Sequence, residues 1–292
     1  MKQQTIEQSV TIKGIGLHTG KNCQAMFLPA PENSGVTFVR TDLPGNPRFL
    51  AHVNNVVDVV RGTTLGQGSD KVYTIEHVLS ALHGLKIDNV IVEMDSHEPP
   101  VGDGSSKFIV QALQSAGIVQ QPSDKKYLTV NTPFEYVSNK TSIRVEPSDW
   151  FEIVCEIGYD HPFLKEQQFT FTEAGDYLSE ISPARTYCFD YEIEALKKKG
   201  LAKGGSLDNA IVIGVTGIYN NESTLRFENE FVRHKILDLM GDLMLIGSPL
   251  RARVIAKRCG HGHNINFLRQ WLQNLSSVQS SGESLAGVQT LN

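Results

Sequence analysis

Three side chains that can bind a metal ion lie on one face of a predicted helix. In the segment EFVRHKILDLMGDL, His234, Asp238 and Asp242 follow one another at intervals of four residues, which places them on one side of an α-helix. A solvated polar face with ion pairs is the commoner reason for such spacing. The remaining residues of this segment are mostly apolar, however, so we expect the helix to be buried nearly all round. Buried charges are costly unless they are paired or bound to a metal ion, so the segment is a candidate for either buried ion pairs or metal ligands.

A histidine with an adjacent glutamate lies on a second predicted helix. A single histidine on an amphipathic helix is more often a core or surface residue than a ligand. If the two helices face each other, however, His77, His234 and Asp238 form a set of two histidines and one carboxylate, which leaves a coordination position of Zn²⁺ open for water. Glu76 would then be placed to deprotonate that water. His83 falls on the opposite face of the helix and is a poor ligand candidate.

Glycine-rich segments carry three further histidines. His261 and His263 lie in RCGHGHN, where either could act as a second proton carrier, and their spacing does not distinguish between them. The segment GIGLHTGK lacks the GxxxxGK[ST] spacing of a phosphate-binding loop, although His18 within it could face a substrate. Thr186 in SPARTY lies in an active-site turn or simply at the start of a strand.

The elements that must position these side chains follow from periodicity. Residues 1–60 contain short runs of alternating apolar and polar residues, which predict strands over about 5–12, 25–28 and 36–39. The segment TIEHVLSALHGL has helical spacing, with Thr74 as the predicted N-cap and Gly84 at its end. A buried strand, NVIVEM, and a second helix, SKFIVQALQSAG, are expected to follow.

The same order of elements returns from about Tyr127. The strands LTVNTPFEYV, TSIRVEP and FEIVCEIGY precede a helix over about 228–246, a strand RARVIA and a last helix from about Asn264. We therefore predict two related halves, residues 1–124 and 125–277, joined by a hinge at 122–126. Residues 182–220 form an insertion with a short helix and an apolar strand, and residues 278–292 are predicted to be a disordered tail.

The composition excludes several classes of protein. A formal charge of −5 over 292 residues, without a basic stretch, argues against a nucleic-acid-binding protein. The four cysteines are too widely spaced to indicate a disulfide framework or a zinc knuckle. We find no signal peptide and no run of about 18 apolar residues, and therefore expect a soluble, cytoplasmic protein.

Taken together, these motifs resemble one enzyme family. The segments GIGLHTG, TIEH, DNVIVEMDSHEPPVGDGSS, SPARTY, GLAKGGSLDNAIVI, RFENEFVRHKILDLMGDL and CGHGHN occur in this order over about residues 3–275. In this order they resemble the UDP-3-O-acyl-N-acetylglucosamine deacetylases of lipid A biosynthesis in Gram-negative bacteria. The resemblance implies an α+β fold of two β-α-α-β domains. In such a fold each sheet packs on helices, the helices of the two domains face one another, and each domain carries one insert.

The resemblance also implies roles for the candidate residues. It implies one Zn²⁺ per chain, with Fe²⁺ possible in the cell, bound by His77, His234 and Asp238, and it implies Glu76 as the general base. His261 matches the second catalytic histidine of the family, which selects it over His263. Asp242 then orients and stabilises the charge of His261, and Thr186 donates a hydrogen bond to the oxygen of the reacting amide.

Further positions match the family's substrate contacts. Lys235 is expected to contact the head group, Tyr187 to stack on the sugar where the family commonly has Phe, and Arg258 to lie near the diphosphate. The side chains expected to line the passage for the acyl chain are Ile193, Ala202, Ser206, Ala210 and Val212. The implied partner is the acylated UDP-sugar, handled by a monomer that associates at most transiently with the inner membrane.

One position departs from the family pattern, and two other functional classes stay open. In RGTTLGQGSDKVYTIEH, a cysteine often found upstream of the Glu-His pair is absent, which leaves the predicted reaction unchanged. Another zinc hydrolase, such as a peptidase, would share the metal ligands but would need neither the stacking aromatic nor the acyl passage. A non-catalytic protein that binds a sugar nucleotide or a lipid would use the His-Asp-Asp stripe only as a polar helix face.

Overall fold

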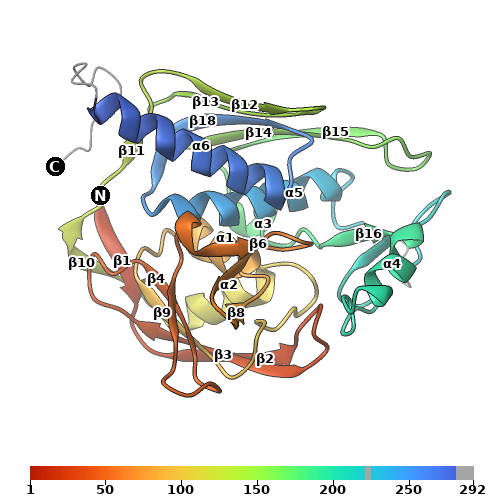
Figure 1. Ribbon diagram of the computed structural model, residues 1–292, viewed down its shortest axis with the longest axis horizontal. Helices are drawn as coiled ribbons and strands as arrows, with labels where there is room; N and C mark the ends of the chain where they lie inside the picture. Colours follow the sequence, from red (N-terminus) through yellow and green to blue (C-terminus); the bar gives the residue numbers. More distant parts are fainter. Residues whose placement is uncertain (221–224, 281–292) are drawn as a thin grey trace.

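Two mixed β-sheets enclose the main helices of the protein. The computed structural model describes residues 1–220 and 225–280, and Figure 1 shows one sheet above the helices and the other below them. The lower sheet has the strand order β2-β3-β9-β4-β5 and the upper sheet β12-β13-β18-β14-β15, with the short β11 paired to β18. The prediction of an α+β fold with sheets packed on helices is confirmed.

The strands of each sheet bury one face. The lower sheet consists of β2 (Val10–Ile15), β3 (Asn22–Pro29), β4 (Val36–Arg40), β5 (Arg48–Leu50) and β9 (Val90–Met94). The upper sheet consists of β11 (Leu128–Thr129), β12 (Phe134–Ser138), β13 (Thr141–Pro147), β14 (Glu152–Gly158), β15 (Glu166–Thr172) and β18 (Leu250–Lys257). Buried and less buried residues alternate along β13, β14 and β18, because successive side chains of a strand point to opposite faces.

The helices between the sheets carry most of the candidate site. They are α1 (Glu76–Gly84), α2 (Lys107–Ser115), α5 (Glu230–Leu243), which continues into η3 (Met244–Ile246), and α6 (His261–Ser280). The helices α1 and α5 pack directly against each other. Nearly every residue of α5 is buried, as its apolar composition predicted, because the helix is covered by α1 on one side and by the upper sheet on the other.

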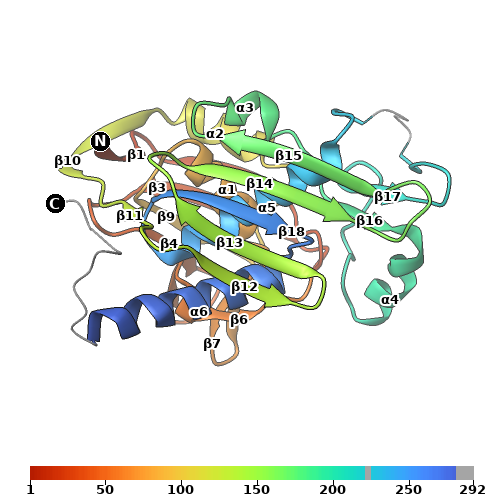
Figure 2. The same ribbon diagram turned by 90° about the horizontal axis from the view of Figure 1, so that it is seen from above.

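Smaller elements surround this core. A three-stranded sheet is formed by β6 (Val56–Asp58), β7 (Thr64–Gln67) and β8 (Asp70–Val72), after η1 (Val53–Asn55). The insertion contains β16 (Tyr187–Phe189), η2 (Asp190–Glu192), α4 (Ile193–Lys198) and β17 (Ile211–Ile213), preceded by α3 (Tyr177–Glu180). Both views show α4 projecting to one side of the molecule (Figures 1 and 2).

Several predicted boundaries differ from the observed ones. Thr74 is not the N-cap of α1: it adopts a left-handed conformation (φ 55°), and Ile75 precedes the helix. The predicted strand over 5–12 is divided into β1 (Lys2–Ile6) and β2. Part of the predicted hinge at 122–126 belongs to β10 (Ile118–Asp124), which pairs with β1. The predicted tail begins within α6, and its remainder, 281–292, lies outside the described residues.

The helices of the structure can be compared with the length and hydropathy that a membrane span requires. In the described parts of the chain, every helix is too short or too polar to cross a bilayer.

Candidate active site

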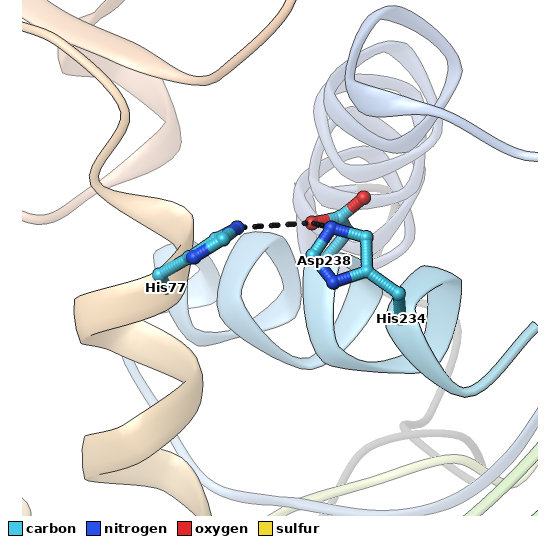
Figure 3. Close-up of side chains that lie close together, drawn as sticks. All are labelled: His77, His234 and Asp238. Atoms are coloured by element: carbon cyan, nitrogen blue, oxygen red, sulfur yellow. Dashed lines mark ion pairs between the residues drawn. The ribbon is translucent and has the colours of Figure 1, made fainter. Parts of the chain in front are cut away.

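The predicted metal ligands meet where α1 and α5 pack together. Figure 3 shows His77 on α1 pointing toward His234 and Asp238 on α5. Oδ1 of Asp238 lies 3.4 Å from Nε2 of His234 and 3.8 Å from Nε2 of His77. One ligand atom from each side chain lies within 4.8 Å of the other two, and all three side chains are buried. The three residues therefore have the arrangement of a metal-binding group.

The protonation states of these side chains suit a divalent cation. Burial lowers the pKa of His77 to about 3 and also lowers that of His234, so both imidazoles are neutral at pH 7. Nδ1 of His234 donates to the carbonyl oxygen of Ala184 at 3.1 Å, which leaves the Nε2 lone pair facing the site. Burial favours the neutral form of Asp238, but His234 and Lys235 hold its pKa well below the usual range. Two neutral imidazoles and one carboxylate are the ligands expected for Zn²⁺ in a catalytic site.

Glu76 lies beside this metal-binding group in a buried position. Its Oε2 accepts a hydrogen bond from the backbone N–H of Thr63 at 2.9 Å, and its Oε1 lies 3.8 Å from Nε2 of His261. Burial raises the pKa of Glu76 to about 7, although the neighbouring His261 opposes this shift. A carboxylate with a pKa near the working pH can accept a proton and release it again.

His261 faces Glu76 from the first turn of α6. Its Nδ1 donates to Oδ2 of Asp242 at 2.9 Å, and its Nε2 lies 3.9 Å from Oδ2 of Asp238. Burial opposes the charged imidazolium, but Asp242 and Glu76 outweigh burial and raise the pKa of His261 to about 10. Asn264 also donates to Oδ2 of Asp242, at 2.8 Å. The structure thus places a histidine whose acid form is favoured opposite a glutamate that can act as a base.

The two histidines that were weighed as alternatives, His263 and His83, make contacts outside the metal-binding group. Nδ1 of His263 lies 3.1 Å from the hydroxyl of Tyr136, on the side of α6 that faces β12. His83 lies against the ring of Phe151, with its Nδ1 3.2 Å from the carbonyl oxygen of Met240.

Two predicted substrate contacts, Lys235 and Tyr187, touch the metal-binding group, and a third, Thr186, lies in the turn that also contacts His234. Nζ of Lys235 donates to Oδ2 of Asp238 at 2.8 Å, and this carboxylate, against the effect of burial, raises the pKa of the lysine. The ring of Tyr187 packs edge-on against His234, with ring centroids 6.1 Å apart, and lies under Lys235. The backbone N–H of Thr186 donates to the carbonyl oxygen of Gly104 at 2.8 Å, which joins the SPARTY turn to the first half of the chain.

His18 connects its glycine-rich loop to two other segments. Its Nδ1 accepts from the backbone N–H of Ala202, and its Nε2 donates to the carbonyl oxygen of Arg61, both at 3.3 Å. The carboxylate of Glu98 accepts from the backbone N–H groups of His18 and Thr19 at about 3 Å. His18 thus joins the N-terminal loop to the insertion.

The remaining predicted positions lie in the insertion and at the end of β18. Ile193 begins α4, Val212 lies in β17, and Ala202, Ser206 and Ala210 lie in the connection between these elements. Arg258 follows β18 in a left-handed conformation, and its backbone N–H donates to the carbonyl oxygen of Glu156 at 2.8 Å.

Sequence reasoning missed several residues that hold the site together. Thr63 contacts both Glu76 and Asp242, and Glu230 accepts from the backbone and side chain of Arg185 in the turn that carries Thr186. Nothing in the segment RGTTLG singles out Thr63, and Glu230 is an acidic residue in the first turn of its helix, where such residues are common. No local pattern could have shown these contacts, because each joins distant segments.

The sequence is similar to proteins of one enzyme family. A sequence model described as UDP-3-O-acyl N-acetylglycosamine deacetylase matches residues 3–273. Two proteins named UDP-3-O-acyl-N-acetylglucosamine deacetylase are similar over most of their length. That of Wolinella succinogenes is 41% identical over 96% of this chain and 93% of its own, and that of Saccharophagus degradans is 42% identical over 94% and 91%. The bifunctional enzyme LpxC/FabZ of Chlorobaculum tepidum is 42% identical over 98% of this chain and 68% of its own.

Proposed function

The chain belongs to the UDP-3-O-acyl N-acetylglycosamine deacetylase family and is a deacetylase of lipid A biosynthesis, and we propose how its residues perform this reaction. The substrate is a 3-O-acylated UDP-N-acetylglucosamine, and the products are acetate and the free amine. The observation that supports the assignment of residues most strongly is that His77, His234 and Asp238 lie together, with Glu76 and His261 facing each other beside them.

We assign one metal ion per chain, Zn²⁺ or, in the cell, Fe²⁺, to His77, His234 and Asp238. Such an ion supplies Lewis acidity, which makes water a stronger acid and stabilises negative charge on a carbonyl oxygen. Lys235 holds the second oxygen of Asp238, so the carboxylate presents its other oxygen to the two histidines. The hydrogen bond from His234 to Ala184 fixes the orientation of its ring in the same way.

Glu76 and His261 carry the protons in this mechanism. Glu76 accepts a proton from the attacking water, because its raised pKa makes its carboxylate a better base than an exposed one. His261 is charged before the reaction begins, because Asp242 lies against its Nδ1. Its Nε2–H can therefore stabilise the oxyanion that forms and then protonate the departing amine. Thr186 adds a hydroxyl donor to the same oxyanion.

The substrate itself is held by the second half of the chain. Tyr187 stacks on the sugar, Lys235 contacts the head group, and Arg258 lies near the diphosphate. His18 faces the substrate from the first half of the chain. The acyl chain occupies a passage within the insertion, lined by Ile193, Ala202, Ser206, Ala210 and Val212. These positions lie in α4, in β17 and in the connection between them, within the unit that projects to one side of the molecule (Figure 2).

The organisation of the chain follows from the same assignment. We propose two β-α-α-β domains, residues 1–124 and 125–277, with an insert in each and with their helices face to face. The contact between α1 and α5 supports this division. We further propose a cytoplasmic monomer that meets the inner membrane only transiently while it exchanges its acylated ligand.

The reaction can be tested by following both products. Purified protein is incubated with 3-O-acyl-UDP-N-acetylglucosamine, and acetate and the free amine are quantified. Equal amounts of the two are expected, while UDP-N-acetylglucosamine without the acyl chain should be a much poorer substrate. A peptide with an N-acetylated residue serves as the control for general amide hydrolysis. Cleavage of that peptide at a comparable rate would contradict the assigned substrate.

A further inference from the structure

One buried threonine contacts both of the groups that we assign to proton transfer. Thr63 lies immediately before β7 and is completely inaccessible to solvent. Its backbone N–H donates to Oε2 of Glu76 at 2.9 Å, and its backbone carbonyl accepts from the N–H of Ile75 at 3.2 Å. Its hydroxyl donates to Oδ1 of Asp242 at 2.6 Å. All three polar groups of Thr63 are therefore directed at the site or at the residue that precedes Glu76.

The hydroxyl of Thr63 completes the hydrogen bonds of a buried carboxylate. Asp242 is also fully buried, and its two oxygens accept from different donors. Oδ2 accepts from Nδ1 of His261 at 2.9 Å and from Nδ2 of Asn264 at 2.8 Å. Oδ1 accepts from Thr63, whose Oγ1 also lies 3.3 Å from Nδ1 of His261. A carboxylate held at both oxygens cannot rotate without losing a charge-assisted hydrogen bond.

This arrangement connects the two halves of the chain at the reacting groups. Glu76 comes from α1, whereas Asp242 and His261 come from α5 and α6. Nε2 of His261 and Oε1 of Glu76 lie 3.8 Å apart, and a small rotation of either side chain would change this separation. When reacting groups are displaced by about 1 Å, the rate can fall by about 100-fold.

We propose that Thr63 is a positioning residue, whose hydroxyl fixes Asp242 and thereby His261 while its backbone N–H fixes Glu76. It does not touch the substrate. This inference rests on the roles proposed above for Glu76, His261 and Asp242, and it adds a residue that sets the distance between them.

The test compares variants that separate the hydroxyl from the methyl group. Thr63→Val keeps the shape and removes the donor, and Thr63→Ser keeps the donor and removes the methyl. Thr64→Val is the matched control, because Thr64 is the next residue, is also buried, and lies in β7. For each protein, kcat and KM for acetate release, zinc content and Tm are measured.

We expect Thr63→Val to lower kcat by about 10- to 100-fold, the range for losing one hydrogen bond to a buried charged group, with KM and zinc content within about twofold of wild type. Thr63→Ser should retain kcat within about threefold, because it restores the donor. Thr64→Val should match wild type. If Thr63→Val is not folded, Thr63→Ala replaces it, and the same loss of kcat is expected.

A second comparison shows whether the effect passes through Asp242. In an Asp242→Asn background, adding Thr63→Val should change kcat by less than about twofold, because the group that it positions is already impaired. A full additional loss in that background would contradict the proposal. So would a Thr63→Val protein with wild-type kcat and a lower Tm, which is the result of a purely structural role. A wild-type protein that releases no acetate would instead refute the proposed function.

Discussion

Replacement of Asp242 by Asn should move one limb of the pH–rate profile and leave the other in place. The substitution keeps the size of the side chain and an oxygen that can accept from Nδ1 of His261, but it removes the negative charge. The rate should fall at low pH as Glu76 becomes protonated and at high pH as His261 loses its proton. Only the second event depends on the charge of Asp242 through direct contact, since Nδ1 and Oδ2 are 2.9 Å apart.

The size of the shift follows from this contact. The nearest atoms are 2.9 Å apart, but both charges are delocalised over the imidazolium ring and the carboxylate, so their centres lie about 4 Å apart. At the effective dielectric constant of about 20 that suits protein sites, two unit charges at about 4 Å attract each other by about 4 kcal/mol. This corresponds to about three pKa units. The pKa of His261, which is raised to about 10 with Asp242 in place, should therefore fall by about three units in Asp242→Asn. A metal ion held by His77, His234 and Asp238 would lower the pKa of His261 in both proteins, so the difference between the two pKa values would remain.

The assay is kcat/KM for acetate release from pH 5 to 10 in wild type and Asp242→Asn, with zinc content measured in both. We expect a bell-shaped profile for wild type. In the variant, the basic limb should lie about three units lower and the acidic limb within about half a unit of wild type. The same substitution in a His261→Ala background is the control, in which the basic limb should no longer respond to Asp242.

Two results would refute this reasoning. If wild type and Asp242→Asn share the same basic limb, the charge of Asp242 does not control the acid form of His261. If the wild-type rate does not depend on pH between 5 and 9, the pairing of Glu76 as base with His261 as acid is itself wrong.

The remaining predictions concern single side chains. Glu76→Gln should keep its zinc but lose about 10²- to 10⁴-fold in kcat, because the amide cannot accept the proton; loss of metal in this variant would show that Glu76 is a ligand. His261→Ala should lose a comparable factor, whereas His263→Ala should stay within about threefold of wild type in kcat, because His263 contacts Tyr136 and not Glu76. The reverse order of these two variants would mean that the wrong histidine has been assigned.

Local periodicity was enough to predict one side of the site. His234, Asp238 and Asp242 share a helix face because their spacing is that of a helix, and α5 covers the predicted span closely. The metal-binding group required α1 and α5 to face each other, which the sequence could only assume. In the structure they do, because Nε2 of His77 lies 3.8 Å from Oδ1 of Asp238. The start of α1 was mispredicted because Thr74 bonds through its hydroxyl to Glu98 and not to the helix backbone.

Other features depend on contacts that no local pattern contains. Thr63 and Asp242 are 179 residues apart in sequence, so their hydrogen bond exists only in the folded chain. The residues alone could not separate His261 from His263, because the last helix was expected to begin at about residue 264. It begins at His261, and two residues along a helix are turned by about 200°, which points the two histidines to different sides.

Metal content measured together with activity tests the central claim most directly. Wild type and His234→Ala are purified without chelator, their zinc is determined by elemental analysis, and acetate release from 3-O-acyl-UDP-N-acetylglucosamine is assayed on the same samples. The account predicts about one zinc per wild-type chain, lost together with activity in the variant, because His234 supplies one of three protein ligands. An active wild type without metal, or a His234→Ala protein that keeps both zinc and turnover, would contradict it.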